Sequence, residues 1–256
     1  MGNTALITGA SSGIGKEFAR IHAATGGDLV IVARSADKLD GLKQELEQAH
    51  NVKVTSISKD LGQPNAAGEI YAAVKAANLQ IDILINNAGF GGRGKFHERD
   101  WADDLAMINL NITALTRLFL PDFVARNSGR ILNVSSTASL LPGPLQAVYY
   151  ATKAYVTSFS NAIAEELHDT DITVTALLPG ATESDFAKVS GMDKTSLFNK
   201  TASAREVAQA GYDAMLAGRL DVIAGMPFGQ RLQLAMIPFA PKKMLLKQIR
   251  EMQEVG

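Results

Sequence analysis

The stretch Thr8-Gly9-Ala10-Ser11-Ser12-Gly13-Ile14-Gly15 joins an apolar run at residues 4–8 to a segment with helical spacing that begins at Lys16. A glycine-rich turn between a buried strand and a helix leaves backbone N–H groups free at the positive end of the helix dipole. Its small residues also allow phosphate oxygens to approach the backbone closely. The turn therefore predicts a phosphate or pyrophosphate site.

Two known phosphate-binding patterns do not match this turn. A P-loop needs four residues between its glycines, followed by Lys-Ser or Lys-Thr. Here five residues separate Gly9 from Gly15, and Lys16 is followed by Glu17, which has no hydroxyl for magnesium. The glycine spacing is G-x-x-x-G-x-G, so the G-x-G-x-x-G fingerprint is absent as well. A dinucleotide turn of different spacing and a plain tight turn remain as alternatives.

Apolar runs and amphipathic stretches alternate along the rest of the chain. The helical spacing is seen in Phe18, Ile21 and His22, and again in Leu39, Leu42 and Leu46. The expected strands are residues 4–8, 29–33, 52–57, 81–85, 130–134 and 173–178, with 221–224 as a further short strand. This alternation predicts a parallel sheet covered on both faces, within a single domain spanning 1–256. It fits a closed barrel or an open doubly wound sheet, and the glycine turn favours the open sheet.

Composition excludes several classes of function. The 256 residues are 46% hydrophobic and 20% charged, with 25 basic against 26 acidic residues and a net charge of −1. This balance predicts no nucleic-acid partner and does not favour membrane contact. The absence of cysteine excludes disulfides and thiolate nucleophiles. No signal peptide or spanning segment is evident, so we expect a soluble, cytoplasmic protein.

The four histidines are scattered along the chain and form no short ligand motif, so no metal site is expected. They are His22, His50, His97 and His168, and each is expected at an ordinary surface or edge position.

Arg34 follows the second expected strand, about 20 residues beyond the glycines, where an acidic side chain would bind a free ribose 2′-hydroxyl. A guanidinium can instead hold a 2′-phosphate through two hydrogen bonds. This position therefore favours NADP(H) over NAD, with Lys38 as an assisting cation. The alternative is a solvated arginine at the start of a helix.

Four further motifs follow in order along the chain, and Pro179-Gly180 comes after the sixth expected strand. The motifs are Asp60-Leu61, Asn86-Asn87-Ala88-Gly89, Ser135-Ser136 and Tyr149-Tyr150-Ala-Thr-Lys153. With them the sequence resembles the short-chain dehydrogenase/reductase family, in its Tyr-x-x-x-Lys subtype, over roughly residues 3 to 225. The resemblance implies a Rossmann-type, three-layer α/β/α domain and a homodimer or homotetramer.

The resemblance also implies which residues bind the cofactor. The pyrophosphate and ribose would be lined by Gly9, Ser11, Ser12, Gly13, Ile14 and Gly15. Asp60 and Leu61 would contact the adenine. Asn87, Ala88 and Gly89 would contact the adenosine ribose, while Asn86 would mainly brace the sheet. The nicotinamide would be bordered by Pro179, Gly180 and Thr182.

The family's reactive residues correspond to Ser136, Tyr149, Lys153 and Asn111. Tyr-x-x-x-Lys selects Tyr149, since Tyr150 is one residue too close to the lysine. The family's serine lies thirteen residues before its tyrosine, which selects Ser136 over Ser135. Its asparagine follows the Asn-Asn-Ala-Gly motif by twenty-two residues, which selects Asn111 over Asn109.

These residues suit hydride transfer between a nicotinamide and a small-molecule carbonyl or alcohol. Tyrosine and lysine four residues apart share one helix face, where the ammonium is expected to lower the pKa of the phenol. Tyr149 would then act as the general acid or base, beside the Ser136 hydroxyl. In the family, the asparagine holds a water that links the lysine to solvent. A catalytically weak NADP-binding sensor or interaction module on the same fold is the alternative function.

Two C-terminal segments carry further hypotheses. Residues 181–202 would lie over the carboxyl ends of the strands as a substrate lid, with Phe186, Val189, Met192 and Phe198 as its apolar contacts. Residues 226–256 form an apolar extension interrupted by prolines and followed by an amphipathic helix. Packing on the protein's own core or on a neighbouring subunit is favoured there. A substrate wall and peripheral membrane contact, helped by the basic residues, are the alternatives.

Overall fold

The computed structural model describes residues 3–111, 114–193, 195, 198 and 201–254. A single seven-stranded parallel sheet runs through it in the order β3-β2-β1-β4-β5-β6-β7. The strands are β1 (Ala5–Thr8), β2 (Leu29–Ala33), β3 (Val54–Ser58), β4 (Ile83–Asn86), β5 (Gly129–Val134), β6 (Ile172–Pro179) and β7 (Asp221–Ala224). Every expected strand is therefore confirmed, and the open, doubly wound alternative is correct.

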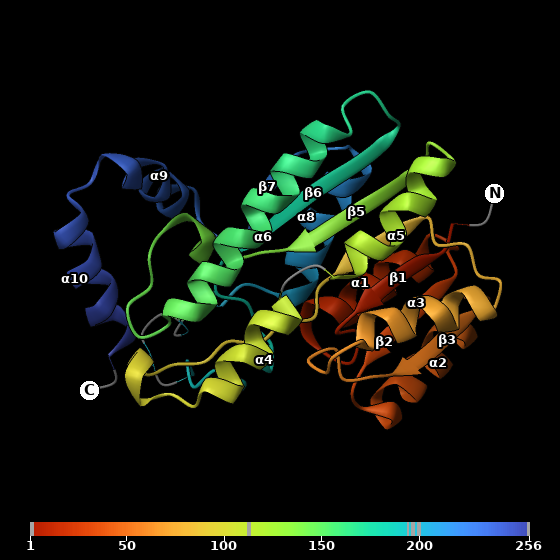
Figure 1. Ribbon diagram of the computed structural model, residues 1–256, viewed down its shortest axis with the longest axis horizontal. Coiled ribbons are helices and arrows are strands. Elements are labelled where there is room, and N and C mark those ends of the chain that lie inside the picture. Colours follow the sequence, from red (N-terminus) through yellow and green to blue (C-terminus); the bar gives the residue numbers. More distant parts are fainter. Residues whose placement is uncertain (1–2, 112–113, 194, 196–197, 199–200, 255–256) are drawn as a thin grey trace.

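Helices cover both faces of the sheet and give three layers (Figure 1). On one face lie α1 (Gly13–Ala24), α2 (Ala36–His50) and α8 (Ala204–Leu216), whose apolar side chains join one core cluster. The other face carries α3 (Ala66–Ala76), α5 (Ala114–Ala125) and α6 (Ala147–Glu166), which form the second cluster. Because the buried strands are apolar on both sides, each face has its own core.

Strands β2 and β3 extend the sheet on one side of β1, and β4 to β7 extend it on the other side. The strand order therefore reverses between β1 and β4. In open α/β sheets this reversal opens a crevice at the carboxyl ends of the strands, where ligands bind. The remaining elements gather near this end or extend beyond it: η1 (Phe96–Glu98), α4 (Trp101–Asn111), η2 (Thr137–Leu140), α7 (Phe186–Val189), α9 (Phe228–Met236), η4 (Ile237–Phe239) and α10 (Lys242–Gln253). We call α9, η4 and α10 together the C-terminal arm.

His22 departs from the sequence prediction. It is fully buried, and each of its ring nitrogens makes a hydrogen bond. Nδ1 lies 2.8 Å from Oη of Tyr212, and Nε2 lies 2.8 Å from the Asn3 carbonyl oxygen. Burial lowers the pKa of this imidazole. The prediction of a surface or edge position was wrong because a partner on α8 satisfies the ring inside the core.

Candidate active site

The glycine turn has the geometry of an anion receptor. Gly9 and Gly13 have positive φ values of +66° and +53°, which residues other than glycine rarely adopt. Helix α1 begins at Gly13, and the side chain of its N-cap residue, Ser12, makes no capping hydrogen bond in the described structure. The N–H groups of the first helical turn therefore face the crevice without a side-chain acceptor.

Thr8 and Asn87 hold this turn against the end of β4. Oγ1 of Thr8 accepts hydrogen bonds from the backbone N–H of Asn87 at 3.0 Å and of Ala88 at 2.9 Å. In return, Nδ2 of Asn87 donates to the carbonyl oxygens of Thr8 at 2.9 Å and Gly9 at 3.3 Å. The side chain of Asn87 thus positions the turn, a role that its motif alone did not reveal.

Asn86 braces the sheet, as expected. Its Nδ2 donates to Oδ1 of Asn133 on β5 at 2.8 Å and to Oγ1 of Thr116 on α5 at 2.9 Å. These bonds fix the end of β4, from which the Asn87–Gly89 loop leaves.

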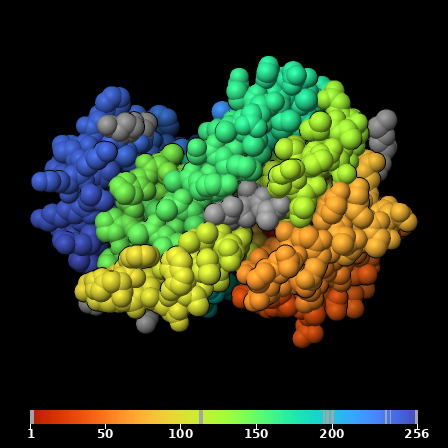
Figure 2. Space-filling model, in the orientation of Figure 1, coloured from red at the N-terminus to blue at the C-terminus, as the bar shows by residue number. Residues whose placement is uncertain are grey.

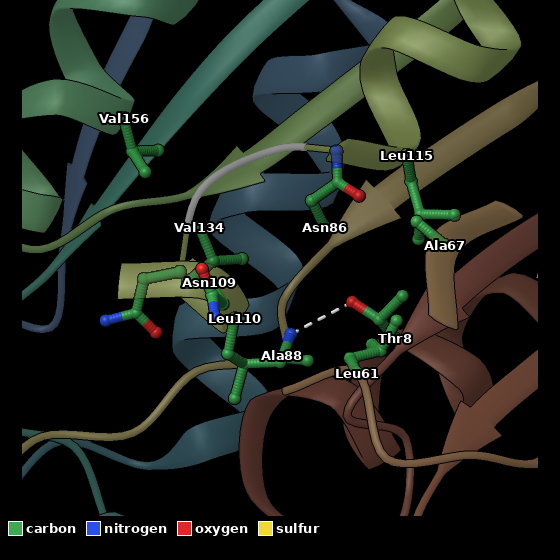
Figure 3. A pocket seen from close by; sticks show the side chains of 11 residues that line it. Thr8, Leu61, Ala67, Asn86, Ala88, Asn109, Leu110, Leu115, Val134 and Val156 are labelled. Carbon is green, nitrogen blue, oxygen red and sulfur yellow. Dashed lines mark hydrogen bonds between the residues drawn. The ribbon is translucent and has the colours of Figure 1, made fainter. Parts of the chain in front are cut away.

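A recess opens at the point where the strand order reverses (Figure 3). Its walls include Leu61, Ala88 and Asn111 from the predicted set, together with Thr8, which Figure 3 shows bonded to the backbone of Ala88. The cavity volume is about 40 Å³, which is room for more than one water molecule. The recess brings together Leu61, from the predicted adenine side, and Asn111, from the predicted reactive side.

Arg34 lies exposed at the end of β2, where its carbonyl oxygen accepts a hydrogen bond from Oγ of Ser58 at 3.0 Å. Within the described residues its guanidinium takes part in no ion pair. The expected helper, Lys38, lies 4.0 Å from a carboxylate oxygen of Asp185. The Asp60 carboxylate accepts the N–H of Gly62 at 3.0 Å, which shapes the loop after β3.

Tyr149 and Lys153 lie one turn apart on α6 and are both buried, the tyrosine being 8% exposed. The Nζ atom of Lys153 donates to the carbonyl oxygen of Val134 at 2.8 Å and lies 5.9 Å from the centre of the Tyr149 ring. Ser136 is the N-cap of η2, and its Oγ accepts the N–H of Ala138 at 3.1 Å. Two elements, η2 and α6, thus bring the predicted serine, tyrosine and lysine to one place.

Burial shifts the pKa of both Tyr149 and Lys153. It raises the pKa of Tyr149, while hydrogen bonding from Ser136 acts in the opposite direction. It lowers the pKa of Lys153 to about 8. The sequence prediction of a lowered pKa for this phenol was wrong for this structure, because removal from water is the largest influence on it and Nζ of Lys153 is bonded to the Val134 carbonyl oxygen.

The neighbouring residues have structural partners instead. Oγ of Ser135 donates to the carbonyl oxygen of Lys153 at 2.9 Å and lies 2.7 Å from Oγ1 of Thr157. The hydroxyl of Tyr150 accepts from Nε2 of Gln253 at 2.9 Å. Ser135 and Tyr150 are thus occupied by structural partners, and the choice of Ser136 and Tyr149 as reactive residues stays a prediction from the family spacing.

Asn111 ends α4 and is buried, whereas Asn109 is exposed. Nδ2 of Asn111 donates to Oγ1 of Thr152 at 3.0 Å and to the Phe90 carbonyl oxygen at 3.2 Å. A Cβ placed on Gly89 would lie 2.8 Å from Oδ1 of Asn111 and 3.4 Å from Nζ of Lys153. Gly89 thus lies against both side chains, which places Asn111 near the lysine.

Pro179 and Gly180 end β6 beside η2, where Oγ1 of Thr137 donates to the Pro179 carbonyl oxygen at 3.2 Å. Thr182 is buried, and its Oγ1 donates to the Gly180 carbonyl oxygen at 2.9 Å. It also pairs with Ala202 in an isolated bridge, so the two ends of the 181–202 segment meet.

The proposed lid is only partly described, because five of its residues lie outside the described ranges. Phe186 packs against Tyr149 with ring centres 5.3 Å apart, and Phe198 packs on Phe186 at 6.5 Å. Met192 is buried and accepts a hydrogen bond from Gln146 at its sulfur. Val189 is 60% exposed, so the prediction of an inward apolar contact was wrong there: it lies on the outer side of α7.

Known proteins resemble this chain over most of its length. The family model described as "short chain dehydrogenase" matches residues 3–195. The very-long-chain 3-oxoacyl-CoA reductase of Homo sapiens is 36% identical over 198 residues, which are 74% of this chain and 62% of the relative. The chain thus spans less than two thirds of that relative's length.

Solved structures agree with this match. A short-chain dehydrogenase from Sphingobium yanoikuyae in complex with NADPH is 33% identical, with a TM-score of 0.82 and 98% of each chain covered. A bulky-bulky ketone specific alcohol dehydrogenase from Comamonas testosteroni is 31% identical, with a TM-score of 0.77, covering 93% of this chain and 92% of that one. Fold, motif order and family match agree: the chain belongs to the short-chain dehydrogenase/reductase family.

Proposed function

We propose that this protein is an NADP(H)-dependent oxidoreductase that interconverts a carbonyl and a secondary alcohol. The observation that carries the proposal is the group of half-buried Ser136 and buried Tyr149 and Lys153 at the carboxyl ends of the strands. A phenol flanked by a hydroxyl and an ammonium can hold and move a proton at a carbonyl oxygen.

The chain's residues fit a nicotinamide dinucleotide phosphate. The start of α1 offers backbone N–H groups that Ser12 does not cap, which suits a pyrophosphate. A Cβ on Gly13 would lie 2.9 Å from Cβ of Ser184, so the turn has no room for a larger residue. The exposed guanidinium of Arg34 suits a ribose 2′-phosphate. Bound there, the nicotinamide would supply the hydride.

Tyr149 is the proton donor in the reducing direction. Burial raises the pKa of its phenol, so the side chain is protonated at neutral pH and can transfer a proton to the developing alkoxide. The Ser136 hydroxyl accepts the Ala138 N–H and is hydrogen-bonded to Tyr149, so it can redirect its hydrogen to the same substrate oxygen. Alcohol oxidation needs the deprotonated phenol, so its rate should rise toward alkaline pH.

Lys153 and Asn111 support this step. A protonated Lys153 stabilises the phenolate left after proton transfer, and the lowered pKa of about 8 leaves most of the lysine charged at pH 7. Asn111 is held by Thr152 and Phe90 beside Gly89 and therefore fixes the floor of the pocket next to the ammonium. We assign Asn111 a positioning role.

The substrate is a bulky apolar ketone, with long-chain 3-oxoacyl thioesters as the first candidates. Aromatic side chains line the approach to Tyr149: Phe186 contacts its ring, and Phe90 packs in the same cluster. The human relative is named a 3-oxoacyl-CoA reductase and the Comamonas enzyme a bulky-ketone alcohol dehydrogenase, which supports this class. Residues 181–202 would act as the lid that encloses the substrate. Family membership also supports a homodimer or homotetramer, which sedimentation velocity would test.

Oxidation of NADPH and of NADH by the purified protein tests the proposal. The carbonyl panel should include short ketones, aldehydes, diketones, bulky aryl ketones and 3-oxoacyl thioesters of increasing chain length. We expect turnover with NADPH well above NADH, rising with the apolar bulk of the substrate. Tight NADPH binding without turnover on any member would favour a sensor or interaction module instead. A preference for NADH would contradict only the role of Arg34.

A further inference from the structure

The C-terminal arm stands apart from the sheet, at the end of the molecule opposite β3 (Figure 1). In the space-filling view it forms an end surface of its own, shown in blue (Figure 2). None of the residues assigned to the candidate site belongs to this arm. Its surface therefore needs a separate explanation.

Large apolar side chains lie on the outer surface of the arm. Phe228, Leu232 and Met236 follow one another at helical spacing along α9 and are all exposed, Phe228 by 82%. Phe239 in η4 is 80% exposed, and Met244 on α10 is exposed as well. Phenylalanines exposed to this extent and grouped on one short segment are unusual for a surface that meets only water.

Basic residues accompany this apolar surface. Between Phe228 and Arg250 the sequence has no acidic residue, and its five basic residues are Arg231, Lys242, Lys243, Lys247 and Arg250. Lys247 and Arg250 are paired with Glu251 and Glu254 one turn further on, whereas among the described residues Lys242 and Lys243 have no ion-pair partner. The whole chain has a net charge of −1, so this positive charge is local to the arm.

The inner side of α10 is attached to the body of the protein. Ile249 and Gln253 are buried, and Gln253 donates to the Tyr150 hydroxyl at 2.9 Å. The guanidinium of Arg93 donates to the Gln253 carbonyl oxygen at 3.2 Å. This side of α10 therefore packs on the protein's own core, as expected. Because α10 is attached in this way, the exposed apolar side chains of the arm do not belong to a loose tail.

We propose that the C-terminal arm binds the surface of an anionic lipid membrane. A helix with apolar side chains on one surface and lysine or arginine around them suits the headgroup boundary of a bilayer. No helix in the described part of the chain is long and apolar enough to cross a membrane. A symmetric second copy is disfavoured, because an isologous contact would bring the unpaired cations Lys242 and Lys243 of both copies to one interface.

The position of the arm sets which side of the protein would face the membrane. Gln253 is bonded to Tyr150, whose ring contacts that of Tyr149 with centres 6.0 Å apart. Membrane docking would therefore hold the side of the molecule next to the reactive tyrosine close to the lipid. The inference does not depend on the proposed oxidoreductase function, since its test measures binding alone.

Co-sedimentation of the full-length protein with vesicles tests the proposal. We expect binding to phosphatidylcholine vesicles that contain phosphatidylglycerol, weaker binding to phosphatidylcholine alone, and release by salt. A basic residue near such a surface contributes about fivefold in partitioning. Lys242→Gln/Lys243→Gln should therefore bind the anionic vesicles about 25-fold more weakly.

Phe228→Ser/Phe239→Ser should lose binding to both kinds of vesicle. The matched control is the variant Phe96→Ser/Trp101→Ser, which lacks one exposed aromatic side chain of η1 and one of α4. This variant should bind both kinds of vesicle like the wild type. Circular dichroism of each variant verifies that the fold is retained.

Absence of binding to anionic vesicles would overturn the proposal, as would equal loss in the Phe96/Trp101 control. If sedimentation velocity shows self-association that Phe228→Ser/Phe239→Ser abolishes, with no vesicle binding by the wild type, the surface contacts a second copy instead. Specific capture of an acidic protein without vesicle binding would contradict the proposal in the same way.

Discussion

Gly9 and Gly26 allow the crowding of the phosphate turn to be measured separately from its backbone strain. Both have φ in the left-handed region, +66° and +81°. A Cβ on Gly9 would lie 2.7 Å from Nδ2 of Asn87 and 3.0 Å from Cα of Ala88, whereas in the described structure a Cβ on Gly26 would meet nothing within 4 Å. Substitution of each by alanine is therefore a matched pair.

The left-handed conformation costs an alanine about 1–2 kcal/mol at either position. The gain from a less flexible unfolded chain is also common to both variants. Crowding adds about 1–3 kcal/mol for Gly9→Ala alone, because the neighbours include backbone that cannot rotate away. In a domain of this size, the Tm of Gly9→Ala should therefore lie about 2–12 °C below that of Gly26→Ala.

Urea unfolding and thermal unfolding of both variants measure this difference, and NADPH titration by fluorescence measures its effect on the turn. We expect Gly9→Ala to lose NADPH affinity because Asn87 must move away from the turn that it holds. Gly26→Ala should bind like the wild type. Equal destabilisation of the two variants, or unchanged NADPH affinity in Gly9→Ala, would refute the assignment of this turn as a crowded phosphate receptor.

Three further predictions concern cofactor choice, pH dependence and the lid. Arg34→Ala should raise the KM for NADPH about 10- to 100-fold, since a hydrogen bond to a charged group contributes about 1.5–3 kcal/mol, and leave the KM for NADH unchanged; equal effects on the two cofactors would contradict 2′-phosphate binding. Burial lowers the folded-state pKa of His22 below its unfolded value. The contribution of the neutral imidazole to stability is therefore complete above about pH 6.5 and is lost as the pH falls through the folded pKa. The free energy of unfolding should fall by up to about 1.4 kcal/mol per pH unit in this range. Urea titrations between neutral and acid pH should show this slope in the wild type and in the exposed control His168→Gln, and a smaller slope in His22→Gln; an unchanged slope in His22→Gln would exclude His22 as its source. Phe186→Ala should reduce kcat/KM for an apolar ketone about 2- to 10-fold through loss of the aromatic contact with Tyr149, and the exposed control Val189→Ala should not; equal effects would argue against a lid.

The sheet and the order of the motifs follow from local patterns, and for that reason the sequence predicted them. Each buried strand of a parallel sheet is a short apolar run, and the start of α1 is marked by glycines that adopt positive φ. The pairing of Ser136 with Tyr149 followed from family spacing, and the structure brings these residues together.

Other features depend on partners distant in the chain, which no local pattern reveals. His22 lies on the apolar side of α1, but its burial requires Tyr212, a residue of α8. The side chain of Asn87 bonds the backbone of Thr8 and Gly9, so its role in holding the turn appears only when β1 and β4 are side by side. The direction of the Tyr149 pKa shift depended on burial by Phe186 and its neighbours, which composition cannot show.

The most direct test of the proposed chemistry compares Tyr149→Phe with Tyr150→Phe. The two tyrosines are adjacent, Tyr149 buried and Tyr150 half-buried, but only Tyr149 lies beside Ser136 and Lys153, while Tyr150 is bonded to Gln253. NADPH oxidation with the best ketone of the panel and NADPH binding by fluorescence should be measured for both. Loss of a general acid costs about 10²–10⁴-fold in kcat, which we predict for Tyr149→Phe with NADPH affinity retained, against a change below about tenfold for Tyr150→Phe. Equal turnover of the two variants, or a greater loss in Tyr150→Phe, would contradict the account.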